Sequence, residues 1–189
     1  DEHGALLILD EVQTGMGHTG KLFAYEHYDI TPDILSSAKA LGGGFPIGAI
    51  LTTDKIAPTF GPGTHGSTFG GNPMACAVGS RAFDIINAPE TLAHVEKQGQ
   101  KFQTTLRELC EKTGVFKEVR GMGLLIGCVL ADKYKGRASE ITAAALKHGL
   151  MVLVAGADVV RFAPSLLLND EDMAEGLKRL EAALTEWIA

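Results

Sequence analysis

The sequence has few cysteines, no long hydrophobic run and no cluster of metal ligands. Its three cysteines, Cys76, Cys110 and Cys128, are odd in number, widely spaced and without a C-x-x-C pair. This pattern argues against a disulfide framework or a zinc site and favours a reducing, cytoplasmic setting. The six histidines also lack metal-ligand spacing, so we expect no metal. The longest apolar stretches, residues 6–9 and 150–155, fall far short of the ~20 residues of a membrane-spanning helix, so we expect no membrane partner.

Positive charge is scarce as well. Seventeen Lys and Arg against 23 Asp and Glu give a formal net charge of -6. Because no basic run stands out that could follow a phosphate backbone, nucleic acid is not an expected partner. Hydrophobic residues make up 46% of the 189, enough for a sizeable core. The chain starts at Asp1 without an initiator Met, and we expect it to be the C-terminal part of a longer protein.

The order of the predicted elements indicates an α/β fold. Residues 5–9 form a continuously apolar run, typical of a strand buried on both faces of a parallel sheet. Short apolar runs at 34–35 and 47–51 predict further strands, and Pro73 predicts the first turn of a helix that ends near Ile86.

The pattern changes after residue 89. Apolar residues then recur at helical spacing from Leu92 to Leu109, and Gly99 occupies the one skipped position on that stripe. The remaining predicted elements are strands near 115–119, 124–130, 151–154 and 159–162, a helix over 138–147, and a last helix with Asn169 as its N-cap. We therefore predict one α/β domain over residues 1–89 and a linking helix with a small α+β domain over residues 90–189.

A glycine-rich loop at residues 15–20 matches nucleotide-binding motifs in part. Gly15, Gly17 and Gly20 match G-x-G-x-x-G, and Lys21 extends the match toward a P-loop. However, two carboxylates, at positions 10 and 11, precede the loop and would repel a phosphate, and a Leu follows Lys21 where a P-loop has Ser or Thr. A nucleotide-binding module stays an alternative that this pattern disfavours.

Two charged residues follow consecutive strands. Asp10 ends the first apolar run, and Lys39 follows the second, immediately before a Gly-rich segment. Carboxyl ends of neighbouring parallel strands meet at one edge of a sheet, so the carboxylate and the amine can converge there.

Three ordered motifs then carry a family resemblance. They are LDEVQTG at 9–15, SAKALGGGFP at 37–46 and HGSTFGGNP at 65–73. In this order they resemble the signatures of class III, ornithine-type aminotransferases that depend on pyridoxal phosphate (PLP). RGMGLLIG at 120–127 and VRFAP at 160–164 are most similar to the acetylornithine branch of that family. The resemblance implies the C-terminal part of the large domain of a fold-type-I PLP-dependent transferase, followed by a small domain.

The resemblance also implies roles for individual residues. Lys39 is the expected catalytic amine, which links to the cofactor and later carries a proton. Asp10 is expected to pair with the protonated ring nitrogen of the cofactor. Val12 would pack on the ring and Gln13 would hydrogen-bond its phenolic oxygen, whereas Glu11 is a cofactor-site residue or a structural one. His18 replaces the arginine usual in the family, and we assign it no catalytic role.

Further roles concern the phosphate and the substrate. Thr68 matches a residue that binds the cofactor phosphate of the neighbouring subunit, which implies a homodimer with a shared site. Ser67 matches a position near the substrate, and Arg161 matches the arginine that binds the substrate carboxylate.

The function implied is transfer of an amino group from N-acetylornithine to 2-oxoglutarate, giving glutamate, a step of arginine biosynthesis. Succinylornithine, succinyldiaminopimelate and ornithine stay open as amino donors. A fragment without a competent site is the alternative of another class.

Overall fold

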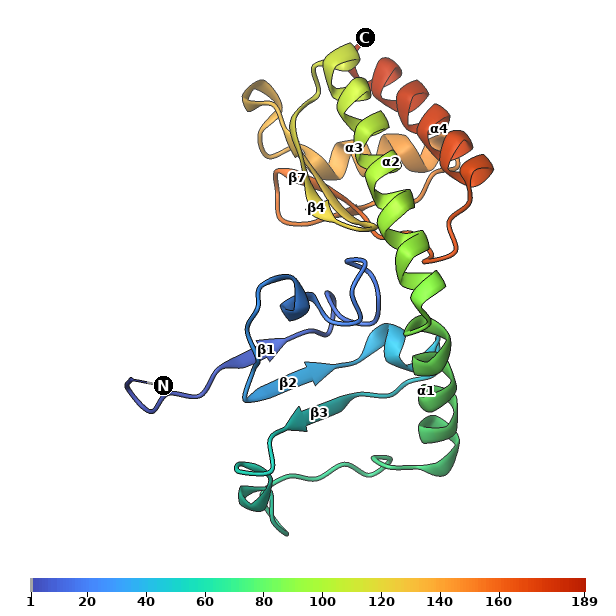
Figure 1. Cartoon of the computed structure of the whole chain (residues 1–189). Coiled ribbons are helices and arrows are strands. Elements are labelled where there is room, and N and C mark those ends of the chain that lie inside the picture. Colours follow the sequence, from blue (N-terminus) through green and yellow to red (C-terminus); the bar gives the residue numbers. More distant parts are fainter. Residues whose placement is uncertain (1) are drawn as a thin grey trace. The chain divides into compact units, whose positions relative to one another are not determined.

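The computed structural model describes residues 2–189 and divides the chain into two compact units, Asp1–Leu92 and Ala93–Ala189 (Figure 1). Each unit has a sheet of its own. Three strands make up the sheet of the first unit and four strands that of the second.

The sheet of the first unit has the order β1-β2-β3 and carries the predicted strands (Figure 1). β1 (Ile8–Asp10) pairs with β2 (Ile34–Ser37) in parallel, and β2 pairs with β3 (Ala49–Thr52) in the antiparallel sense. Three short 3-10 helices lie between and after the strands: η1 (Ala24–His27), η2 (Lys39–Gly42) and η3 (Ala57–Thr59). The register pairs Asp10 with Ser36, so both residues lie at the same carboxyl edge.

The prediction that the first apolar run is buried on both faces is wrong for this structure. Leu6, Leu7 and Ile8 are 50%, 40% and 62% exposed. Among the described residues β1 pairs with β2 alone, so it is an edge strand. Side chains of a strand are buried by segments that pack on the two faces of its sheet, and within residues 2–189 such segments leave Leu6, Leu7 and Ile8 uncovered.

Helix α1 (Pro73–Ile86) begins where the sequence predicts. The side-chain oxygen of Asn72 accepts a hydrogen bond from the Ala75 N–H at 2.9 Å, and Pro73 occupies the first helical position. Such a cap stabilises a helix by about 1 kcal/mol because it satisfies an N–H that has no partner within the helix. Gly79 of α1 lies close to Ile47: a Cβ at Gly79 would contact the Ile47 side chain at 3.4 Å.

The second unit combines a four-stranded antiparallel sheet with helices (Figure 1). Its sheet order is β4-β5-β7-β6. The strands are β4 (Phe116–Met122), β5 (Leu125–Leu130), β6 (Leu153–Val154) and β7 (Val159–Phe162). The helices are α2 (Pro89–Thr113), η4 (Asp132–Tyr134), α3 (Ala138–Lys147) and α4 (Asp170–Ile188). Helix α2 begins in the first unit. Asn169 caps α4, as predicted, by accepting from the Asp172 N–H at 2.8 Å.

One continuous apolar core holds the second unit together. Side chains from α2, α3, α4 and the sheet contribute to it, and Leu106, Leu124, Leu180 and Leu184 are essentially inaccessible to water. Burial of a leucine side chain contributes about 1.5–3 kcal/mol relative to leaving it exposed. Gly99 is buried on the same helix face, where a Cβ would lie only 2.2 Å from the Gly123 carbonyl oxygen. The skipped position in the apolar stripe is therefore the point at which α2 meets the β4–β5 turn backbone to backbone.

Residues 2–189 contain neither a membrane-spanning helix nor a cluster of metal ligands. No helix there is long and apolar enough to cross a lipid bilayer. No group of three or more His, Cys, Asp or Glu side chains in that range is arranged to hold a metal ion.

Candidate functional site

The candidate site lies at the carboxyl ends of β1 and β2. Asp10 is the last residue of β1, and Lys39 follows β2 by two residues at the start of η2. Hydrogen bonds from Val12 and Ser36 are the main cause of a lowered pKa of Asp10, and the positive charge of Lys39 adds a smaller effect in the same direction. The structure thus brings together the two residues on which the sequence interpretation depends.

The Asp10 carboxylate is held by two donors. The Val12 N–H donates to Asp10 Oδ1 at 3.0 Å, and the Ser36 hydroxyl donates to the same oxygen at 2.9 Å. These two hydrogen bonds, the Val12 bond first, lower the pKa of Asp10 below its ordinary value, because both favour the ionised form. Asp10 is therefore an ionised carboxylate at neutral pH.

The Lys39 amine is exposed and has a defined partner. Its Nζ donates to Gln13 Oε1 at 3.0 Å, which brings another predicted site residue into the same group. The Lys39 backbone has a φ of 50°, in the left-handed region that residues other than glycine rarely adopt. Together, Asp10, Gln13 and Lys39 form a compact polar cluster at the edge of the sheet.

Glu11, next to Asp10 in the chain, is buried and makes structural hydrogen bonds. It is 3% exposed, and its carboxylate accepts from the Ala24 N–H at 3.1 Å, the Tyr25 N–H at 2.9 Å and the Thr14 hydroxyl. The first two donors belong to η1, so Glu11 ties the end of β1 to this short helix. Of the two roles that the sequence left open for Glu11, these contacts favour the structural one.

Glu11→Ala is expected to destabilise the chain by about 2–4 kcal/mol, because two backbone N–H groups would lose a buried charged acceptor. Urea unfolding followed by circular dichroism measures this change. Glu2→Ala removes an exposed carboxylate of the same unit and is expected to stay within about 0.5 kcal/mol of the parent chain. Equal stability of the two variants would contradict the structural role of Glu11.

The glycine-rich loop lacks the geometry of a nucleotide site. Gly17 and Gly20 have φ values of 85° and 89°, so the loop is tightly turned. It leads into η1, which is a four-residue 3-10 helix and not the long α-helix whose N-terminus binds a phosphate. His18 in this loop is partly buried, and burial lowers its pKa.

Thr68 and Ser67 lie in an exposed segment before α1. Gly70 lies close to Ser67, so that a Cβ at Gly70 would lie only 2.9 Å from the Ser67 Cβ. The structure gives neither residue a hydrogen bond to Asp10, Gln13 or Lys39. Both residues are exposed, so an anion can reach them.

Arg161 lies in the middle of β7 in the second unit. It faces Gly127 of β5 on one side and Leu153 of β6 on the other. Its side chain helps to line a cavity of about 300 Å³ whose other walls include Met151, Leu153 and Pro164. The Nε atom of Arg161 is buried without a hydrogen-bond partner. A buried guanidinium nitrogen with no partner has free capacity for an anionic ligand.

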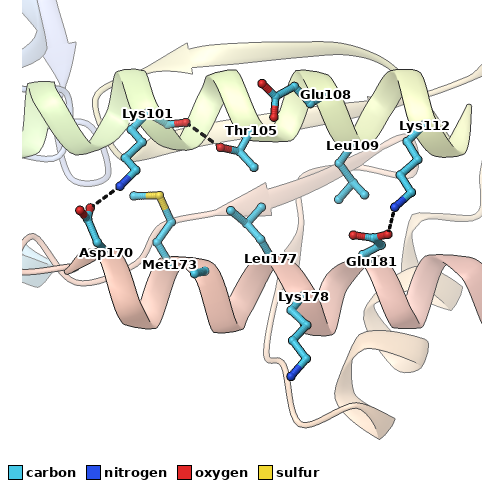
Figure 2. Close-up of a pocket in the computed structure, with 11 residues that line it drawn as sticks. Lys101, Thr105, Glu108, Leu109, Lys112, Asp170, Met173, Leu177, Lys178 and Glu181 are labelled. Atoms are coloured by element: carbon cyan, nitrogen blue, oxygen red, sulfur yellow. Dashed lines mark hydrogen bonds and ion pairs between the residues drawn. The ribbon is translucent and has the colours of Figure 1, made fainter.

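A second hollow, of about 480 Å³, lies between α2 and α4 (Figure 2). Ion pairs between Lys101 and Asp170, at 2.8 Å, and between Lys112 and Glu181 join the two helices. Figure 2 shows the side chains of Met173 and Leu177 between these pairs. None of the predicted site residues lines this groove, and its contacts serve the packing of the two helices.

Ser36 is a site residue that the sequence analysis missed. Its hydroxyl binds Asp10 only because the parallel register places the two residues opposite each other. A serine within a short apolar strand gives no signal of its own.

Comparison with known proteins supports the family suggested by the motifs. Residues 1–184 match the family model described as aminotransferase class III. The chain belongs to the class III aminotransferase family. It is 81% identical over all 189 residues to the acetylornithine aminotransferase of Neisseria meningitidis serogroup B, and it covers 48% of that protein.

Solved structures of other aminotransferases have the same fold. The N-acetylornithine aminotransferase of Stenotrophomonas maltophilia matches with a TM-score of 0.91 and 47% identity, over 100% of this chain and 49% of that one. An ornithine aminotransferase of Toxoplasma gondii, described with PLP at partial occupancy in its active site, matches with a TM-score of 0.88 and 33% identity, over 98% of this chain and 44% of that one. The chain therefore spans about half the length of these aminotransferases.

Proposed function

We propose that the protein is a PLP-dependent aminotransferase that moves an amino group between N-acetylornithine and 2-oxoglutarate. The observation that carries the proposal is the placement of an exposed lysine amine and an ionised carboxylate at the carboxyl ends of two adjacent parallel strands, with Gln13 in hydrogen-bond contact with Lys39. Family membership and the 81% identity to an acetylornithine aminotransferase support the same conclusion.

The residues at this edge fit PLP. Asp10 has one oxygen held by two donors of the chain, while no partner is found for Oδ2 among the described residues, which leaves it available to a cationic N–H. The Lys39 amine is exposed, so it is accessible to an aldehyde carbon. Asp10, Val12, Gln13 and Lys39 would hold the ring, and Thr68 would hold the phosphate. When bound, PLP supplies an aldehyde carbon and a ring that accepts electrons from the reacting carbon of the substrate.

The chain's own residues then have distinct tasks. The Asp10 carboxylate holds a proton at the ring nitrogen by Coulomb attraction. The Lys39 amine would attach the cofactor and would carry the proton that the reaction moves. Val12 would pack against the ring, and Gln13 would donate an amide N–H to its phenolic oxygen.

Substrate binding is assigned to Ser67 and Arg161. The planar guanidinium of Arg161, with its unpartnered Nε, is suited to two parallel hydrogen bonds with a carboxylate. Succinylornithine, succinyldiaminopimelate and ornithine each carry a carboxylate and a free primary amine, so they are the alternative amino donors.

The assembly proposed is a cytoplasmic homodimer with a shared active site. Thr68 is exposed and makes no hydrogen bond to the cluster around Lys39, which suits a residue that binds the phosphate of the neighbouring subunit. All three cysteines are free thiols, as expected in a reducing compartment. Within each subunit, residues 1–89 would belong to the large cofactor-binding domain and residues 90–189 to the linking helix and small domain.

Reduction with borohydride tests the proposal directly. The chain is incubated with PLP, reduced, digested and analysed by mass spectrometry. We expect one dominant phosphopyridoxyl adduct, on Lys39, because its exposed amine follows the carboxyl end of β2, beside the strand that ends in the Asp10 carboxylate. Adducts spread evenly over surface lysines, such as Lys55 and Lys101, would contradict the proposal and favour a fragment without a competent site.

A further inference from the structure

Asp10 receives both of its hydrogen bonds on one oxygen. The Val12 N–H and the Ser36 hydroxyl lie 3.0 and 2.9 Å from Oδ1. The Val12 bond is local, from two residues further along the chain, a geometry common to aspartate side chains in turns. The Ser36 bond is different, because it joins β1 to β2 across the sheet.

The two donors restrict the carboxylate in complementary ways. A single local bond leaves the side chain free to rotate toward other donors of its own turn. A second bond from the neighbouring strand fixes the direction of the Cγ–Oδ1 bond, and the direction of Oδ2 then follows from the planarity of the carboxylate. An exposed side chain such as Asp10 would otherwise occupy several rotamers.

We propose that Ser36 is a positioning residue, which fixes the rotamer of the Asp10 carboxylate so that Oδ2 is presented to a cationic ring N–H. The inference rests on the proposed function, since the cation is the protonated pyridine nitrogen of PLP. Ser36 touches neither cofactor nor substrate in this role and acts only through Asp10.

Ser37 provides a matched control. It is the next residue of β2, and its buried hydroxyl has no hydrogen-bond partner among the described residues. Ser37→Ala therefore removes a hydroxyl from the same strand without removing a bond to Asp10. Ser36→Thr is the second control, because it keeps a hydroxyl at position 36.

The first measurement is made on the chain without cofactor. The Asp10 side-chain carbon is followed by NMR over a pH titration. Ser36→Ala is expected to raise the pKa of Asp10, because the ionised form loses a donor, whereas Ser36→Thr and Ser37→Ala are expected to leave it unchanged. An Asp10 pKa that is the same in Ser36→Ala and in the parent chain would overturn the inference, whatever the cofactor does.

The second measurement is the affinity for PLP. We expect Ser36→Ala to weaken binding about two- to fivefold, a small factor because solvent screens an exposed charged group. Unchanged affinity together with a raised Asp10 pKa would also overturn the positioning role. If the parent chain does not bind PLP although Asp10 titrates as expected, the proposed function is wrong. Ser36 would then have no cofactor for which to position Asp10. Thermal unfolding midpoints within a degree or two of the parent would show that the variants are folded.

Discussion

Under the proposed function, Lys39→Ala is expected to abolish covalent attachment of PLP and to reduce transamination by about 10⁴-fold, because the variant would lack the amine to which attachment and proton transfer are both assigned. The visible absorbance of bound cofactor and the rate with N-acetylornithine and 2-oxoglutarate measure the two effects. The effect on stability is expected to be small, because Lys39 is exposed and its amine makes one hydrogen bond, to Gln13.

Two further variants separate the roles of the Lys39 amine. Lys39→Arg keeps a positive charge and a donor for Gln13 but has no nucleophilic amine, so it is expected to lose attachment as completely as Lys39→Ala. Lys55→Ala removes another exposed amine of the first unit and is expected to leave attachment and rate unchanged. Turnover by Lys39→Arg near the parent rate would reduce Lys39 to an electrostatic role and refute the assignment.

Gly99→Ala is expected to destabilise the second unit by about 3 kcal/mol or more, at the upper end of the range for overpacked cores. The added Cβ would lie 2.2 Å from the carbonyl oxygen of Gly123 and 2.4 Å from its carbonyl carbon. Both atoms belong to the backbone, so relief requires α2 or the β4–β5 turn to move. Urea unfolding, followed by the fluorescence of Trp187, measures the change.

Gly176 is the matched control for this prediction. It also lies inside a helix, α4, but a Cβ there would meet only the Leu150 side chain, at an ordinary 3.8 Å. Gly176→Ala is expected to stabilise the chain by about 0.5–1 kcal/mol, because alanine has the higher helix propensity. A Gly99→Ala variant as stable as Gly176→Ala would show that α2 does not pack against the turn as described.

Local signals explain why the helices are predictable from the sequence. Asn72 and Asn169 supply side-chain caps at the residues where α1 and α4 begin. Burial of the first strand was not predictable in the same way, since it depends on which segments cover β1 and not on the apolar run itself. Gly99 lies between these cases: the gap in the stripe is visible in the sequence, whereas its contact, Gly123, comes 24 residues later.

In the candidate site, too, some features have a local signal in the sequence and others depend on tertiary structure. Strand ends at Asp10 and Lys39 are recognisable from apolar runs, and their proximity follows from parallel pairing. The hydrogen bond from Lys39 to Gln13 and the bond from Ser36 to Asp10 depend on register and rotamer, which no residue pattern encodes. The buried contacts of Glu11 with η1 depend in turn on how the glycine-rich loop folds back.

The backbone of Lys39 carries a conformational cost. At a φ of 50° an L-residue is less favourable than glycine by about 1 kcal/mol. Under the proposed function, the need for an amine is the reason that position 39 holds a lysine and not a glycine, and other contacts of the unit have to offset this thermodynamic cost.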